Sequence, residues 1–123
     1  MIETEELHRG ASASVLALVV DGRSETLGFL NELPDDLFDK MQMLIGKLAE
    51  YRFLANQEKF RRLATGIYEL KLRKPPVRLF CFQDGPNWIC THGDMKPGKR
   101  ELQSHIAKVQ KLRRGYFEEK SKT

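Results

Sequence analysis

The sequence IYELKLRKPPVRLFCFQ, at residues 67–83, carries the clearest structural signal in the chain. Its first part alternates between apolar and charged side chains, which is the period-two pattern of a β-strand with one buried face. Two consecutive prolines end this strand, because proline cannot donate to a backbone ladder. Residues 77–83 predict a second strand, apolar on both sides and therefore central. A turn at residues 84–87 and a third strand over 88–94 complete an antiparallel meander.

The segments around the meander predict one more strand and three helices. An apolar run predicts a strand over residues 15–20, and Ser24 is a suitable N-cap for a helix over 24–33. A second helix over 34–53 has an apolar stripe, and a third spans 99–118. The stripe residues are Leu37, Met41, Leu44, Leu48 and Tyr51. We therefore predict a small α+β domain in the order β-α-α-β-β-β-α, with two N-terminal helices packed on a mostly antiparallel sheet and all helices on one face.

The remaining segments lack periodicity. Residues 1–13 are predicted to be a flexible arm, residues 14–120 the folded domain, and residues 56–66 a polar connection. No apolar run approaches the roughly 18 residues needed to cross a bilayer, and the polar N-terminus is unlike a signal peptide. The two cysteines, Cys81 and Cys90, are too few for a disulfide framework or a structural zinc site. These features predict a reduced, cytoplasmic protein with no membrane partner.

Charge is distributed unevenly along the chain. Residues 1–58 carry five Lys and Arg against eleven Asp and Glu, whereas residues 59–123 carry sixteen against six. So basic a second half indicates a polyanionic partner, either nucleic acid or an acidic protein. An unevenly charged solvated surface explains the same counts.

The central strand suggests where a polyanion would bind. If Val77, Leu79 and Cys81 face the helices, Arg78, Phe80 and Phe82 face outward, beside Lys71 and Arg73. Cations next to exposed aromatic rings form a platform for stacked bases and phosphates. In the alternative interpretation, Phe80 and Phe82 are core residues beneath the last helix.

Three segments resemble the RelE/HigB superfamily, and in particular its HigB-like, phage-derived members. They are FRRLATGIYELKLR at residues 60–73, VRLFCF at 77–82 and ICTHGDMKPGKRE at 89–101. The resemblance covers about residues 15–117 in the right order of elements. It implies the toxin of a type II toxin–antitoxin pair, a metal-independent endoribonuclease without a cofactor that cleaves mRNA on the ribosome. The implied partners are a helix-turn-helix antitoxin and, through that antitoxin only, operator DNA.

The resemblance also implies roles for individual residues. Lys71 matches a strand lysine that acts as base or holds the phosphate, and Arg78 matches an arginine that stabilises the transition state. The remaining matches are RNA-binding positions. They are Arg73, Lys96, Lys99, Arg100 and, near the C-terminus, Tyr116 as a base-stacking residue.

The role of His92 depends on the register of the last hairpin. A four-residue turn places Leu79 opposite His92 and directs the imidazole to the core, whereas a three-residue turn places Phe80 there and directs it to the open face. In the second case His92 is a candidate proton carrier. The four-residue turn also sets Cys81 opposite Cys90, and we predict free thiols. Glu69 is either a base or a cross-strand partner of a basic residue.

Other histidines and other functions complete the set of hypotheses. His8 and His105 are expected to be incidental, and no metal site is predicted. A ParE-like DNA gyrase poison has a similar fold without nuclease chemistry. A non-catalytic RNA-binding module would keep Phe80 and Phe82 and tolerate loss of Arg78.

Overall fold

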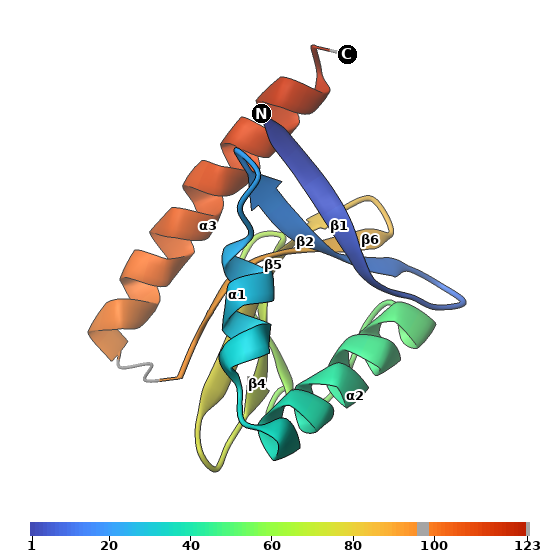
Figure 1. Ribbon diagram of the computed structural model, residues 1–123, viewed down its shortest axis with the longest axis vertical. Coiled ribbons are helices and arrows are strands. Elements are labelled where there is room, and N and C mark those ends of the chain that lie inside the picture. The colour runs from blue at the N-terminus through green and yellow to red at the C-terminus, as the bar shows by residue number, and fades with distance from the viewer. Residues whose placement is uncertain (96–98, 123) are drawn as a thin grey trace.

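Six strands form one sheet in the order β1-β2-β6-β5-β4-β3 in the computed structural model, which describes residues 1–95 and 99–122 (Figure 1). The strands are β1 (Ile2–Arg9), β2 (Ser14–Val20), β3 (Phe60–Ala64), β4 (Ile67–Leu72), β5 (Val77–Asp84) and β6 (Asn87–Asp94). The helices are α1 (Glu25–Glu32), α2 (Asp35–Tyr51) and α3 (Lys99–Lys120). All neighbouring strands pair antiparallel except β2 and β6, which are parallel. The α+β class is therefore confirmed.

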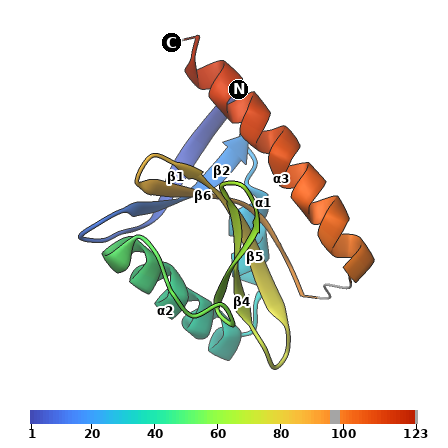
Figure 2. The same ribbon diagram turned by 180° about the vertical axis from the view of Figure 1, so that it is seen from behind.

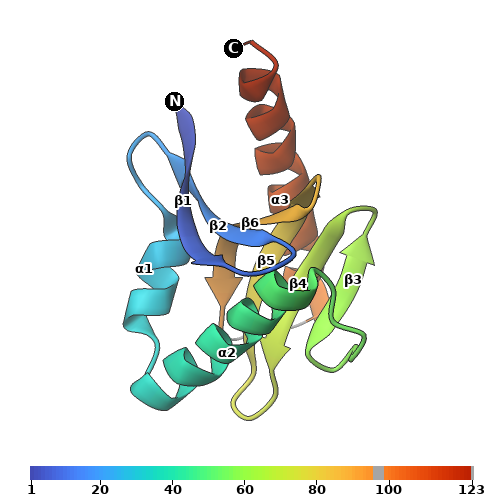
Figure 3. The same ribbon diagram turned by 90° about the vertical axis from the view of Figure 1, so that its right-hand side faces the viewer.

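The helices cover both faces of the sheet. One core cluster joins α1 and α2 to Leu70, Leu79 and Trp88, and a second joins α3 to Phe80 and Phe82. Figure 3 shows α2 in front of the sheet and α3 behind it, and Figure 2 shows β4 and β5 between these two helices. The prediction that all helices lie on one face is wrong, because β5 is apolar on both sides and its second side also requires cover.

The N-terminus is an edge strand, so the predicted flexible arm over residues 1–13 is also wrong. β1 pairs with β2 from Ile2↔Val20 to Arg9↔Ser14, and Figure 1 shows its start beside the end of α3. The backbone N–H of Ile2 donates to Glu119 Oε1 at 2.8 Å. The charged side chains of β1 are exposed, as is usual at the edge of a sheet.

Residues 56–66, predicted as a connection, contain the opposite edge strand. β3 pairs with β4, with Arg61 opposite Glu69 and a register shift between Arg62 and Ala64. Only Phe60 of this strand is buried, which leaves little periodicity in the sequence.

The hairpin between β5 and β6 combines both predicted registers. Near the turn, Gln83 faces Trp88 and Cys81 faces Cys90, as the four-residue turn requires. A register shift after Cys81 then places Phe80 opposite His92. Both cysteines are buried free thiols, and burial raises the pKa of Cys81.

Local signals set the ends of the helices. Ser24 Oγ accepts from the backbone N–H of Leu27 at 3.2 Å, which confirms it as the N-cap of α1. In α2 the predicted stripe is buried apart from Tyr51, which lies in the last turn and is exposed. Within the described residues, none of the helices combines the length and apolar character that crossing a membrane requires.

Candidate functional site

Charged residues from three neighbouring strands meet on the α3 face of the sheet. Lys71 of β4 lies opposite Arg78 of β5, and Arg78 lies opposite Asp94 of β6. Lys71 and Arg78 lie one row from the Leu72–Val77 end of the β4–β5 ladder, which is the end remote from the β5–β6 turn. The Arg78 side chain keeps 20% of its surface exposed, so it is partly open to solvent.

A buried carboxylate organises these cations. Glu69 is fully buried, with Oε2 2.7 Å from Arg61 Nη2 and Oε1 3.2 Å from Arg78 Nε. Among the described residues neither oxygen receives a well-directed hydrogen bond, so the carboxylate is held mainly by charge. A buried ion pair of this kind is expensive to desolvate and is weak evidence for stability alone. Glu69 is thus the cross-strand partner of two arginines, one of the two roles predicted for it, and it cannot reach a ligand.

We call Arg61, Lys71 and Arg78 the cation cluster. Lys71 has a pKa below its ordinary value, first because it is partly buried and then because Arg61 repels its charge, with Glu69 acting in the opposite direction. A lysine of this kind holds more neutral amine near physiological pH than an exposed one does, which is the form that accepts a proton. The cluster therefore offers positive charge and a potential base in one place.

A chain of hydrogen bonds lies beside the cation cluster and ends on Asp94. Thr91 Oγ1 is 2.8 Å from His92 Nδ1, His92 Nε2 is 2.9 Å from His105 Nδ1, and His105 Nε2 is 2.8 Å from Asp94 Oδ2. The Phe80 ring stacks against both imidazoles, with centroids 4.9 Å from His92 and 4.6 Å from His105. We call Thr91, His92, His105 and Asp94 the histidine chain.

His92 is the buried member of the histidine chain. Only 3% of it is exposed, and burial, followed by the charge of Lys108, lowers its pKa to about 4. It is therefore neutral at physiological pH. When His105 is neutral as well, each donor points the same way: the Thr91 hydroxyl to His92, His92 Nε2–H to His105, and His105 Nε2–H to the Asp94 carboxylate. The chain connects a buried imidazole to the strand position facing Arg78.

Phe80 does not belong to an RNA-binding platform. Its side chain is fully buried beneath α3 and packs against both imidazoles, so the prediction that it stacks on RNA bases is wrong. The alternative interpretation, in which Phe80 and Phe82 are core residues under the last helix, holds. The physical reason is again that β5 has two apolar sides and α3 covers the second.

Tyr116 is not brought together with the cation cluster. Its hydroxyl donates to Asp84 Oδ2 at 2.6 Å, and burial together with this carboxylate raises its pKa. Asp84 ends β5, six residues from Arg78, which corresponds to about 20 Å along a strand.

The other predicted phosphate-binding residues lie outside the cluster or outside the described region. Arg73 follows β4, is exposed, and pairs with Glu58 at 3.2 Å. Lys96 lies outside the described residues, and so do the side chains of Lys99 and Arg100, whose backbone begins α3.

Sequence reasoning missed Arg61, Asp94 and His105. Arg61 lies in the strand that was predicted as a connection, and its partner Glu69 is eight residues away across a turn. His105 was expected to be incidental because a lone histidine on a polar helix carries no local signal; its contacts depend on how α3 packs.

Comparison with known proteins finds no matching family model, no matching curated protein and no matching solved structure. Within the described residues, no group of three or more His, Cys, Asp or Glu side chains is arranged to hold a metal ion. The groups that the structure brings together for chemistry are the cation cluster and the histidine chain.

Proposed function

We propose that this chain is the toxin of a type II toxin–antitoxin pair and cleaves messenger RNA on the ribosome. The observation that carries the proposal is the cation cluster, in which Lys71 and Arg78 lie side by side at a partly open end of the sheet, organised by a buried carboxylate. A buried ion pair is weak evidence for stability alone, and perturbed titratable groups concentrate at functional sites. The implied partners are mRNA and an antitoxin protein of helix-turn-helix type in the cytoplasm.

The proposed reaction needs no metal or cofactor. The ribose 2′-hydroxyl oxygen attacks the adjacent phosphorus, a bond forms between them, and the bond from phosphorus to the 5′-oxygen breaks. The products are a 2′,3′-cyclic phosphate and a 5′-hydroxyl end. A base takes the 2′-hydroxyl proton, an acid protonates the leaving 5′-oxygen, and positive charge stabilises the pentacoordinate transition state. Such electrostatic stabilisation is commonly the largest catalytic contribution.

Each step has a candidate group in this chain. Arg78 would contact the phosphate oxygens through its planar guanidinium. Lys71, with its lowered pKa, would accept the 2′-hydroxyl proton. A doubly protonated His105 beside the Asp94 carboxylate would supply the proton for the 5′-oxygen and return to its neutral form. The buried His92, which then accepts from His105 Nδ1–H, would hold His105 in position without contacting RNA.

Expression of the chain in bacteria without an antitoxin tests the proposal. Growth should stop, and mapping of RNA ends should reveal new 5′-hydroxyl ends within translated messages. Lys71→Ala, which removes no partner of the buried Glu69, should restore growth and abolish these ends. The exposed Lys111→Ala on α3 is the matched control and should remain toxic.

Other outcomes would overturn the proposal. Growth arrest with broken DNA and intact mRNA would replace it with a gyrase poison. RNA binding without cleavage of either nucleic acid would reduce the protein to a binding module.

A further inference from the structure

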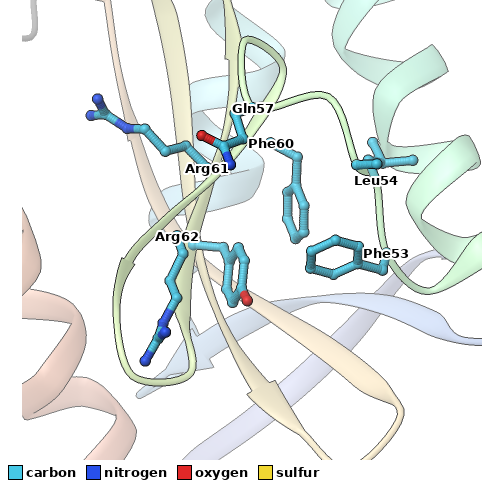
Figure 4. Close-up of a pocket in the computed structure, with 8 residues that line it drawn as sticks. Phe53, Leu54, Gln57, Phe60, Arg61 and Arg62 are labelled. Carbon is cyan, nitrogen blue, oxygen red and sulfur yellow. The ribbon is translucent and has the colours of Figure 1, made fainter.

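A pocket lies at the free edge of the sheet, where β3 meets the segment that follows α2 (Figure 4). Its volume is about 410 Å³. Its walls are aromatic and aliphatic side chains, with an amide and guanidinium groups at the rim. The lining includes Phe53, Leu54, Gln57, Phe60, Arg62 and Tyr68.

The aromatic walls of the pocket are held in place from behind. Tyr68 stacks on Phe60 at a centroid distance of 4.7 Å, and both rings contact the buried Trp88 at 5.0 and 5.1 Å. Phe53 meets Phe60 and Tyr68 edge-on, yet 53% of Phe53 is exposed. An aromatic ring this exposed, beside a rigid aromatic cluster, leaves a planar apolar surface open to a ligand.

The charge of the pocket is positive. Arg61 and Arg62 both contribute to its lining, but the Arg61 guanidinium is paired with Glu69 on the other face, so the charge comes from Arg62; none of the described lining residues is acidic. Arg62 is exposed and, within the part of the chain that the structure describes, makes no ion pair; its contacts are with the carbonyl of Ala64 and the hydroxyl of Thr65. A ligand that fits these features has a flat aromatic part and a negative charge next to it.

The pocket adjoins the cation cluster across strand β3. Figure 4 shows the Arg61 side chain extending away from the rings of Phe53 and Phe60, and its guanidinium pairs with Glu69 on the α3 face. β3 is the last strand of the sheet and lies two strands from β5, which is about 10 Å. A single strand of RNA can therefore pass over this free edge, with phosphates on one side and a base on the other.

We propose that this pocket binds an unpaired base of single-stranded RNA, with Phe53 and Tyr68 contacting the base and Arg62 contacting its phosphate. This inference rests on the proposed function and adds a second subsite to it. Stacking of bases on aromatic side chains and pairing of arginine with phosphates are the usual means by which proteins hold single-stranded RNA. An acidic peptide would suit the charge of Arg62, whereas a nucleotide supplies a planar ring and a phosphate in one unit, which matches both features of the pocket.

Binding of an RNA that cannot be cleaved tests the subsite. The probe is a fluorescent single-stranded RNA decamer with 2′-O-methyl groups throughout, and its affinity is measured by anisotropy. Phe53→Ala should weaken binding roughly tenfold, the scale expected for loss of one stacked base. Arg62→Gln should also weaken binding and should reduce the salt dependence by about one phosphate contact.

Two control variants leave the pocket intact. Tyr51→Ala removes a neighbouring aromatic side chain that is even more exposed but does not line the pocket, and Arg9→Gln removes a cation at the opposite edge of the sheet. Both should bind the decamer like the unmodified protein. A second measurement uses the single tryptophan: Trp88 contacts both Phe60 and Tyr68, so its fluorescence should change when the decamer binds and should change less in Phe53→Ala.

Failure of this inference and failure of the proposed function are distinguishable. If Phe53→Ala and Arg62→Gln bind the decamer as tightly as the controls, the subsite is refuted even where cleavage occurs. The subsite is also refuted if these two variants bind the decamer normally and lose affinity only for an acidic protein. If both variants lose affinity but the protein cleaves no RNA, the subsite stands and the nuclease proposal fails.

Discussion

The two faces of the sheet share strands β4, β5 and β6, but they bury different chemistry. On the face covered by α1 and α2, the buried side chains include Leu70, Leu79 and Trp88. On the face covered by α3, a fully buried carboxylate and an almost fully buried imidazole lie among the apolar residues. Burying apolar groups stabilises the fold, whereas burying charged or titratable groups costs free energy unless they are paired. The first face therefore supplies stability, and the second carries the groups suited to chemistry.

Replacing Glu69 by Gln should have the largest effect on stability among the variants of the α3 face. The change leaves Arg61 and Arg78 next to each other without the carboxylate that separates them. Loss of one partner from a buried ion pair should lower the free energy of unfolding by about 3 kcal/mol. Urea denaturation measures this change in the free energy of unfolding. Glu58→Gln, which removes an exposed partner of Arg73, should be almost neutral, and equal effects of the two variants would contradict the difference between buried and exposed pairs.

His92 should make the stability of the α3 face depend on pH. The pKa of His92 is about 4 in the folded protein, whereas the ordinary value of 6.5 applies to the unfolded chain. Between pH 4 and 6.5 the unfolded chain therefore binds more protons than the folded protein does. The stabilising contribution of neutral His92 to the free energy of unfolding is complete above pH 6.5 and is lost as the pH falls toward 4. From pH 7 to 4.5 the unfolding free energy should fall by about 2 kcal/mol more in the unmodified protein than in His92→Gln.

A variant of the opposite face provides the control for this pH dependence. Leu79→Ala should destabilise the protein by roughly 2–5 kcal/mol through loss of core packing. It should retain the full pH dependence of the unmodified protein, because Leu79 lies in the other core cluster. If His92→Gln shows the same pH profile as Leu79→Ala, the buried imidazole is not responsible.

The smallest effect is expected for Arg73. Its ion pair with Glu58 is exposed, so Arg73→Gln should change the free energy of unfolding by less than about 0.5 kcal/mol. If Arg73 contacts a phosphate, RNA affinity should fall equally for all sequences, and the salt dependence of binding should decrease by about one. Binding titrations at several salt concentrations measure both quantities. A loss confined to particular sequences would instead indicate contact with a base.

The elements with regular periodicity were predictable from the sequence. The meander, strand β2 and all three helices lie within two residues of their predicted ends, because each has a continuous apolar pattern and its own cap or turn. The edge strands β1 and β3 were missed because an edge strand buries few side chains and so carries little alternation. The place of α3 was left open, since the apolar second side of β5, formed by Phe80 and Phe82, fits either an exposed platform or a core beneath the last helix.

The site was predictable only in part. Lys71 and Arg78 lie together because they alternate onto one face of adjacent strands, which sequence spacing can reveal. The contact of His105 with His92 and Asp94 depends on the packing of α3 across the sheet, which no local pattern encodes. Strand alternation likewise predicts an exposed Arg78. The fold instead pairs Arg78 with the buried Glu69, so an Arg78→Ala variant also disturbs that ion pair.

The most direct test of the account is the rate of RNA cleavage in a pair of matched variants. Glu69→Gln keeps Arg78, whereas the double variant Glu69→Gln with Arg78→Gln removes the guanidinium without leaving a buried carboxylate unpaired. Glu69→Gln should cleave a ribosome-bound message in a single turnover within about tenfold of the unmodified rate. In the double variant the rate should fall a further hundred- to thousandfold, which corresponds to a loss of roughly 2.7–4 kcal/mol of transition-state stabilisation. Equal rates in the two folded variants would contradict the claim that Arg78 stabilises the transition state.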